Sequence, residues 1–231
     1  MLSVKQLNHF YGESHTLWDL SLEVPEGACV CVMGRNGVGK TTLLKCIMGL
    51  ETPREGSIRL GDVALGEQPA EARARHGVGY VPQGREIFPR LTVEENLHLG
   101  ITTRGGRGRE ALARVYEMFP VLKKMLRRRG GDLSGGQQQQ LAIGRALVLE
   151  PKLLILDEPC EGIQPNIVQE IGDLIIRLNR ELGLTVMLVE QKLPFARRVA
   201  STFCVMDKGR VVATDRMDQL SDELVRQYLT V

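Results

Sequence analysis

The segment Gly34-Arg35-Asn36-Gly37-Val38-Gly39-Lys40-Thr41-Thr42 constrains this chain more than any other. It fits the phosphate-loop pattern G-x-x-x-x-G-K-[ST]. An apolar run precedes it from Ala28 to Met33, and apolar residues at helical spacing follow it from Lys40 to Leu50. In a strand, loop and helix of this kind, backbone N–H groups surround phosphate oxygens at a helix N-terminus. Lys40 then reaches the β- and γ-phosphates, and the Thr41 hydroxyl ligates Mg²⁺.

A second apolar run, Leu153 to Leu156, ends in two carboxylates, Asp157 and Glu158. At a strand end, Asp157 is placed to hold Mg²⁺ through water, and Glu158 to polarise an attacking water. The alternative is a strand that simply stops at solvent, where acidic residues are common. The phosphate loop in the same chain favours the first interpretation.

A third segment, Leu133-Ser134-Gly135-Gly136-Gln137, precedes a long helical stretch. A serine hydroxyl and glycine N–H groups at a helix start make a second anion cradle. Ordinary phosphate-loop kinases and GTPases need no second cradle so far from their own loop.

The rest of the sequence alternates strands with helices, which predicts an α/β fold with a largely parallel sheet. Strands are predicted at Leu2–Phe10, Leu17–Val24, Ala28–Met33, Gly56–Val63, Val78–Val81, Leu153–Leu156, Thr185–Val189, Thr202–Met206 and Arg210–Ala213. Helices are predicted at Lys40–Leu50, Arg109–Leu126, Pro165–Leu182 and from about Leu193, and Thr92-Val93-Glu94-Glu95 resembles a capped helix start. Thr102 to Gly108 is expected to be a basic, glycine-rich loop.

Composition excludes several classes of protein. The formal charge of +2 and the 4% aromatic content argue against nucleic-acid binding. The five cysteines (Cys29, Cys31, Cys46, Cys160 and Cys204) are scattered, so we expect reduced, structural thiols in a cytosolic protein. No apolar run approaches the ~18 residues that span a bilayer, and no signal core is present at the N-terminus. The chain is therefore expected to be soluble, serving any membrane through a partner.

The phosphate loop, the Leu133–Gln137 segment and the Asp157-Glu158-Pro159 strand end resemble, in order and spacing, those of the ATP-binding-cassette (ABC) ATPase family. The resemblance covers the whole chain. It implies a P-loop NTPase core with an N-terminal antiparallel β-sheet and an inserted α-helical subdomain. Residues 1–231 would form one ABC ATPase domain, with residues 1–90 and 150–231 as the core and residues 91–149 as the helical subdomain.

The resemblance also implies roles for single residues. ATP and Mg²⁺ would be the cofactors. Two ATPase domains would meet head to tail, with Leu133, Ser134, Gly135, Gly136 and Gln137 of each completing the other's site. Tyr11 would stack on adenine, beside the phosphate-loop residues Gly34, Arg35, Asn36, Gly37, Val38, Gly39, Lys40, Thr41 and Thr42. Glu158, Gln83 and Gln191 would be catalytic, and Thr41, Gln83 and Asp157 would hold the metal. Two of these roles have alternatives. Tyr11 could instead be a half-buried strand aromatic, and Gln83 could be a polar turn residue.

Two residues depart from the family pattern, and these departures indicate a subgroup of the family. Gln191 stands where the family has a histidine, and an amide donates a hydrogen bond but carries no proton. This leaves Glu158 as the candidate base. Gln164 replaces an inter-subunit aspartate. Val189-Glu190-Gln191, Pro82-Gln83-Gly84-Arg85 with Phe88, and Glu161-Gly162-Ile163-Gln164-Pro165 resemble importers for branched-chain amino acids and amides, most of all the urea-type ATPase subunit.

The expected function is ATP hydrolysis that powers import of a small polar solute, most of all urea or a related amide, with a branched-chain amino acid as the alternative. Partners would be transmembrane permease subunits, a second ATPase subunit and, indirectly, a solute-binding protein. The chain would lie peripherally at the cytoplasmic face of the inner membrane. Rival classes are a soluble ABC ATPase of DNA repair or translation, an exporter ATPase and a non-hydrolysing regulatory module.

Overall fold

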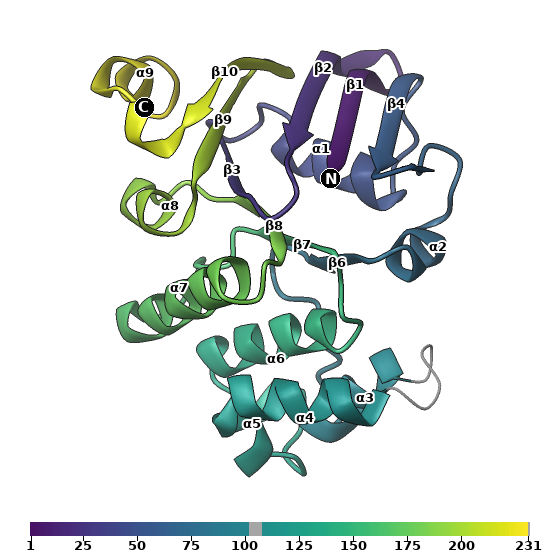
Figure 1. Ribbon diagram of the computed structural model, residues 1–231, viewed down its shortest axis with the longest axis vertical. Coiled ribbons are helices and arrows are strands. Elements are labelled where there is room, and N and C mark those ends of the chain that lie inside the picture. The colour runs from purple at the N-terminus through teal and green to yellow at the C-terminus, as the bar shows by residue number, and fades with distance from the viewer. Residues whose placement is uncertain (102–107, 231) are drawn as a thin grey trace.

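Three strands of the protein are buried at every residue: β3 (Cys29–Met33), β7 (Leu153–Asp157) and β8 (Thr185–Val189). They lie at the centre of a six-stranded sheet with the order β10-β9-β3-β8-β7-β6 in the computed structural model, which describes residues 1–101 and 108–230 (Figure 1). β6 (Val78–Val81) and β9 (Thr202–Asp207) run parallel to their neighbours, whereas β10 (Arg210–Arg216) is antiparallel to β9. Runs of apolar residues thus form strands covered on both faces.

Alternate residues of these strands enter two separate cores. Cys29, Cys31 and Met33 pack with helices α6, α7 and α8, whereas Val30 and Val32 pack toward α1 and a second sheet. The helices are α1 (Lys40–Met48), α6 (Gly135–Leu147), α7 (Pro165–Arg180) and α8 (Leu193–Val199). All five cysteines are buried and unpaired, as predicted.

The second sheet is antiparallel, with the order β2-β1-β4-β5 (Figure 1). Its strands are β1 (Leu2–Tyr11), β2 (Ser14–Val24), β4 (Glu55–Leu60) and β5 (Val63–Ala64). The single strand predicted at Gly56–Val63 is wrong, because the chain reverses at Gly61 and Asp62 and pairs Leu60 with Val63. Gly61 has a φ of 56°, which suits a tight hairpin turn.

A group of helices occupies the other end of the molecule: α3 (Val93–Ile101), α4 (Gly108–Met118), α5 (Pro120–Lys124) and α6 (Figure 1). Thr92 and Glu95 exchange the hydrogen bonds of a capping box, so the predicted helix start is confirmed. The single helix predicted at Arg109–Leu126 is wrong, because Pro120 has no N–H to continue it and instead begins a new helix. The predicted loop at Thr102 to Gly108 lies outside the described residues, except that Gly108 begins α4.

Two helices and two 3-10 turns carried no sequence signal that we used. They are α2 (Ala70–Arg75), α9 (Asp222–Tyr228), and the 3-10 turns Gly130–Asp132 and Met217–Gln219. In the part of the chain that the structure describes, no helix has both the length and the apolar character needed to cross a membrane.

One buried charge joins α2 to the helix that follows the phosphate loop. Arg73 is 2% exposed and donates to the carbonyl oxygens of Cys46 at 2.6 Å and Ile47 at 2.8 Å, which end α1. It also donates to Gln68 and Gly66 carbonyls. Burial lowers the pKa of the guanidinium, and the carbonyl dipoles at the helix C-terminus stabilise its charge.

We expect Arg73→Met to lower the free energy of unfolding by about 3 kcal/mol, because buried carbonyl oxygens lose their donors. Arg75→Met is the matched control, since Arg75 lies in the same helix but is exposed, and it should change stability by less than about 0.5 kcal/mol. Urea denaturation followed by circular dichroism measures both. Equal effects of the two substitutions would contradict the role given to Arg73.

Candidate functional site

The phosphate-loop segment connects β3 to α1 and leaves the start of α1 open. Gly39 lies at the N-cap in a left-handed conformation, and no side chain accepts from the first N–H groups of the helix. A side chain there would be strained, because Gly39 has a φ of 103° and a Cβ would also lie 2.8 Å from Leu17 Cδ2. These free N–H groups and the helix dipole make the loop suited to an anion.

Lys40 lies buried in this loop and is bound to the loop's own backbone. Its Nζ donates to the Gly34 carbonyl at 2.7 Å and the Arg35 carbonyl at 2.8 Å. Burial lowers the pKa of Lys40, and the carboxylates of Glu158 and Asp157 oppose that shift. A phosphate would offer the ammonium group stronger, charged acceptors than these carbonyl oxygens.

A cavity of about 570 Å³ adjoins the loop. It brings together most of the predicted loop and catalytic residues with a few that were not predicted, and its lining comprises Thr16, Asn36, Gly37, Gly39, Lys40, Thr41, Thr42, Gln83, Glu158, Glu161, Glu190, Gln191 and Lys192. Residues from five separate parts of the sequence thus face one space.

Asp157 and Glu158 lie where β7 ends. Asp157 is buried, and its Oδ2 has no hydrogen-bond partner. Burial raises the pKa of the Asp157 carboxyl to about 6, with Glu158 adding to the rise and Lys40 opposing it. Glu158 has a φ of 47°, and its N–H donates to the Val189 carbonyl at 2.9 Å. This turn directs the Glu158 carboxylate into the cavity.

The unpartnered oxygen of Asp157 suits a cation. The described residues contain no group of three or more His, Cys, Asp or Glu that could hold a metal by themselves. Mg²⁺ is one such cation, since it takes one or two protein oxygens and completes its shell with water and substrate phosphates. That Asp157, Thr41 and Gln83 hold it stays a prediction.

Gln191 connects the phosphate loop to Glu158. Its Nε2 donates to Asn36 Oδ1 at 2.7 Å and also to Glu158 Oε1. The turn that carries it is fixed by Glu190, whose buried carboxylate accepts from the N–H groups of Gln191 at 2.8 Å and Lys192 at 2.9 Å. Glu190 was not predicted as a site residue, although an acidic residue just before a helix start is a capping signal.

Gln83 lines the cavity, but its amide is engaged by another residue. Gln83 Nε2 donates to Glu161 Oε2 at 3.0 Å. Its contact with a metal stays a prediction. Glu161 was not predicted as a site residue, and only its place just beyond Asp157 and Glu158 in the sequence hinted at it.

The remaining predicted residues do not line the cavity. Tyr11 is 45% exposed at the end of β1, edge-on to His9, and its stacking on adenine stays a prediction. The Arg35 side chain is directed away from the loop, to the carbonyl oxygens of Gln227 and Thr230 beside α9. Val38 is buried and packs against Gly34.

The second cradle lies at the start of α6, apart from the cavity. Ser134 is the N-cap, and it forms a capping box in which the Gln137 N–H donates to Ser134 Oγ at 3.4 Å and the Ser134 N–H to Gln137 Oε1 at 3.0 Å. Leu133 is buried as an anchor, and Gly135 and Gly136 are the first helical residues. The five residues of this segment, three of them predicted to bind phosphate, thus lie outside the phosphate-loop cavity of their own chain.

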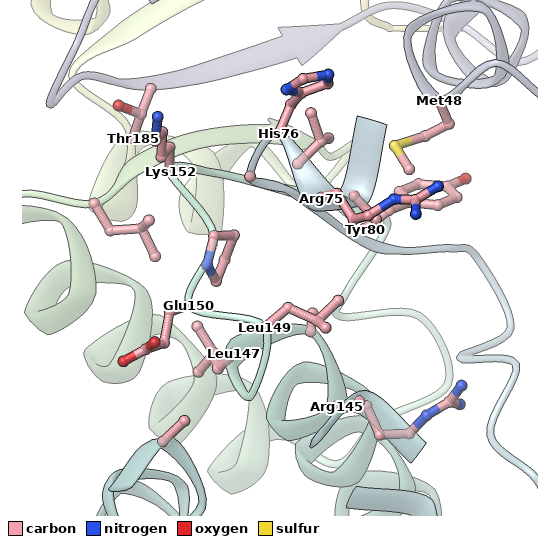
Figure 2. A pocket seen from close by; sticks show the side chains of 18 of the residues that line it. Met48, Arg75, His76, Tyr80, Arg145, Leu147, Leu149, Glu150, Lys152 and Thr185 are labelled. Atoms are coloured by element: carbon pink, nitrogen blue, oxygen red, sulfur yellow. The ribbon is translucent and has the colours of Figure 1, made fainter. Parts of the chain in front are cut away.

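A larger groove of about 1940 Å³ contains none of the phosphate-loop residues. Figure 2 shows Met48, Arg75 and Tyr80 on one side of it and Arg145, Leu147 and Leu149 on the other. The first three come from α1, α2 and β6, and the others from α6 and the turn after it. The chemistry described above lies in the smaller cavity, because Lys40, Glu158 and Gln191 line that cavity.

Comparisons with known proteins agree with this geometry. Residues 17–161 match the protein family described as ABC transporter. The high-affinity branched-chain amino acid transport ATP-binding protein BraG of Pseudomonas aeruginosa is 44% identical over 93% of this chain and 92% of its own length. The glutamate/aspartate import ATP-binding protein GltL of Escherichia coli K12 is 34% identical over 96% of this chain and 94% of its own.

Solved structures share the fold. The dimeric post-hydrolysis state of the ATP-binding cassette MJ0796 bound to ADP and Pi superposes with a TM-score of 0.84 and 29% identity, over 94% of this chain and 99% of that one. A structure titled as the ATP-binding subunit of an ABC transporter superposes with a TM-score of 0.83 and 31% identity, over 98% and 92% of the two chains.

We expect Lys40→Ala to weaken ATP binding by about tenfold or more, because a charge-assisted contact with phosphate is lost in a buried site. Lys45→Ala, one turn further along α1 and outside the cavity, is the control and should bind ATP as the unaltered protein does. Fluorescent ATP titration measures both affinities. An unchanged affinity in Lys40→Ala would exclude the phosphate-loop interpretation.

Proposed function

The chain belongs to the ABC transporter family, and we propose that it is the ATP-hydrolysing subunit of an importer for small polar solutes. Membership confirms the predicted fold, a P-loop core with an antiparallel sheet and a helical subdomain. The observation that carries the proposal is the convergence of Lys40, Glu158 and Gln191 on one cavity beside a free helix start.

Hydrolysis is assigned to residues of this cavity. Lys40 exchanges its carbonyl partners for the β- and γ-phosphates. Glu158 accepts a proton from the water that attacks the γ-phosphorus, the bond from that phosphorus to the bridging oxygen breaks, and ADP leaves. Gln191 holds Glu158 and Asn36 before ATP binds, and it exchanges one of these two N–H hydrogen bonds for one to the γ-phosphate. When bound, Mg²⁺ would neutralise phosphate charge, held by Asp157, Thr41 and Gln83.

Turnover in this proposal needs a second ATPase subunit. Ser134, Gly135 and Gly136 lie outside the cavity of their own chain, so their cradle is free to bind a phosphate held by another. The phosphate loop of one subunit and the Ser134–Gly136 segment of the other would bind the same γ-phosphate from opposite sides, and this closes a head-to-tail dimer. We place a different ATPase subunit opposite this chain in the cell and expect a homodimer in isolation.

The larger groove is the proposed docking place of the transmembrane permease subunits. Exposed Leu50, Phe88, Leu99 and Leu182 line it. Exposed apolar side chains gathered along one groove are typical of interaction sites. The groove adjoins the connection that carries Gln83, so docking and catalysis share one segment. Through this contact the chain would lie peripherally at the cytoplasmic face of the membrane, with a solute-binding protein acting indirectly through the permease.

We infer that the imported solute is a branched-chain amino acid. The 44% identity to BraG over nearly the whole chain supports this, as do the Val189-Glu190-Gln191 and Glu161–Pro165 segments. Urea or a related amide is the second candidate, favoured by the Glu161–Pro165 run together with Ser134–Gln140. The relatives reported above are named for amino acids, so urea takes second place.

We expect Glu158→Gln to bind ATP and to accumulate as a closed dimer, because the substitution keeps the shape of the side chain but removes the proton acceptor. Steady-state ATPase activity should fall by about a hundredfold or more. Gel filtration with and without ATP, beside a phosphate-release assay, measures both properties. Normal turnover by this variant would remove Glu158 from its role.

We expect Leu50→Glu to lose the permease subunits in a mild-detergent pull-down, because a charge enters the apolar groove, while ATP binding persists. Val212→Glu, on β10 outside the groove, is the matched control, since Val212 is similarly exposed. In cells, Leu50→Glu should lose uptake of labelled leucine. Loss of urea uptake with leucine uptake intact would support the second candidate, and soluble partners alone would support a role in DNA repair or translation.

A further inference from the structure

We propose that Arg85 is a positioning residue that couples two elements. One is helix α6, called the signature helix here because the Leu133–Gln137 segment begins it. The other is the loop after β7, residues 158–161, called the catalytic loop because it contains Glu158. The inference rests on the proposed ATPase function and deepens it. Arg85 lies two residues after Gln83, on the connection from β6 to the helical group, and it lines no part of the phosphate-loop cavity. We therefore expect Arg85 to influence how the phosphate loop and the Ser134–Gly136 segment are arranged, and not to contact ATP itself.

The guanidinium of Arg85 spans the space between these two elements. Its Nη1 donates to Gln138 Oε1 at 3.1 Å, in the first turns of α6, and its Nη2 donates to the Glu161 carbonyl at 3.2 Å. A Cβ on Gly135 would lie 3.3 Å from both Nη atoms, so the guanidinium packs directly on the first residue of α6. One side chain thus contacts the signature helix and the loop that begins with Glu158.

The backbone that carries Arg85 is held in a costly conformation. Arg85 and Glu86 have φ values of 73° and 47°, in the left-handed region that non-glycine residues rarely adopt. Such residues persist where their surroundings fix them. Arg145, near the end of α6, donates to the Glu86 carbonyl at 2.7 Å and lies 4.5 Å from the centre of the Phe88 ring. The connection is therefore fastened to α6 at both ends of that helix.

The catalytic loop is also hydrogen-bonded to the turn that carries Gln191. Lys192 Nζ donates to the Cys160 carbonyl at 2.7 Å, and Gln191 Nε2 donates to Glu158. A displacement of α6 relative to the core can therefore reach Glu158 through Arg85 and the 158–161 segment. Lysine cannot replace Arg85, because it lacks the planar fork that donates in two directions.

Arg85 also lines the larger groove. A permease segment docked there would lie beside a side chain that already contacts α6 and the loop after β7. The geometry thus places the docking surface, the start of α6 and the catalytic loop around one guanidinium.

The test uses the Glu158→Gln protein, whose ATP-dependent dimer reports closure. Adding Arg85→Gln should weaken ATP-dependent dimerisation by about tenfold, in the range of coupling through direct contacts, while ATP affinity of the monomer changes less than about twofold. Arg85→Lys should restore little. Arg90→Gln, an exposed arginine on the same connection, is the matched control and should leave dimerisation unchanged. In the Glu158-intact protein, Arg85→Gln should lower kcat and leave KM for ATP nearly unchanged.

A distance measurement separates positioning from a general loss of stability. The native cysteines are buried, so spin labels at Asp62→Cys and Glu117→Cys report the helical group against the core. Arg85→Gln should broaden the distance distribution, whereas Arg90→Gln should not. If Arg85→Gln does not fold, Gln138→Ala removes one contact and should act in the same direction. Unchanged dimerisation and an unchanged distribution in these variants would overturn the proposal.

The two proposals fail in different ways. If Glu158→Gln with Arg85 intact forms no ATP-dependent dimer, the proposed function is wrong. If that dimer forms and is indifferent to Arg85→Gln and Gln138→Ala, only the coupling role is wrong.

Discussion

The register of three parallel strands determines where the chemistry of this protein can occur. Val189 of β8 pairs with Val32 of β3 on one side and with Asp157 of β7 on the other. The segments that follow these strands, the phosphate loop, the Glu158 turn and the Gln191 turn, therefore leave the sheet at the same level. Carboxyl ends of parallel strands meet at one edge, where α/β proteins bind ligands. A one-residue slip in either pairing would separate Lys40, Glu158 and Gln191.

This shared edge concentrates charged groups, and two of them, Lys40 and Asp157, are buried. Lys40 is buried between its own loop and two carboxylates, and the pKa of Asp157 is raised toward neutrality by burial. Buried charges are tolerated when partners satisfy them, yet Asp157 keeps one oxygen without a partner. The proposed ligand would bring negative phosphates to Lys40 and a cation to Asp157. MgATP has that composition.

The sequence was most informative where a local pattern carries its own geometry. The phosphate loop, the buried strands and the Thr92–Glu95 cap are defined by neighbouring residues, and each lies where it was predicted. The hairpin at Gly61 and the break at Pro120 were missed, although both residues are structure breakers, because the surrounding apolar pattern was given more weight. Long-range contacts had no local signal. The pairing of Gln83 with Glu161, the burial of Arg73 and the role of Glu190 depend on which loops meet at the sheet edge.

The two departures from the family pattern gain a physical meaning from these contacts. Gln191 donates to both Asn36 and Glu158, so it can hold the base and the phosphate loop together without carrying a proton. Gln164 is the N-cap of α7 and provides no side-chain cap there, a position where aspartate is strongly preferred. Pro165 begins the helix instead, and its missing N–H reduces the need for a cap. Both positions hold a neutral amide in place of a titratable group, so positioning of Glu158 rests on neutral hydrogen bonds and on the loop contacts that surround it.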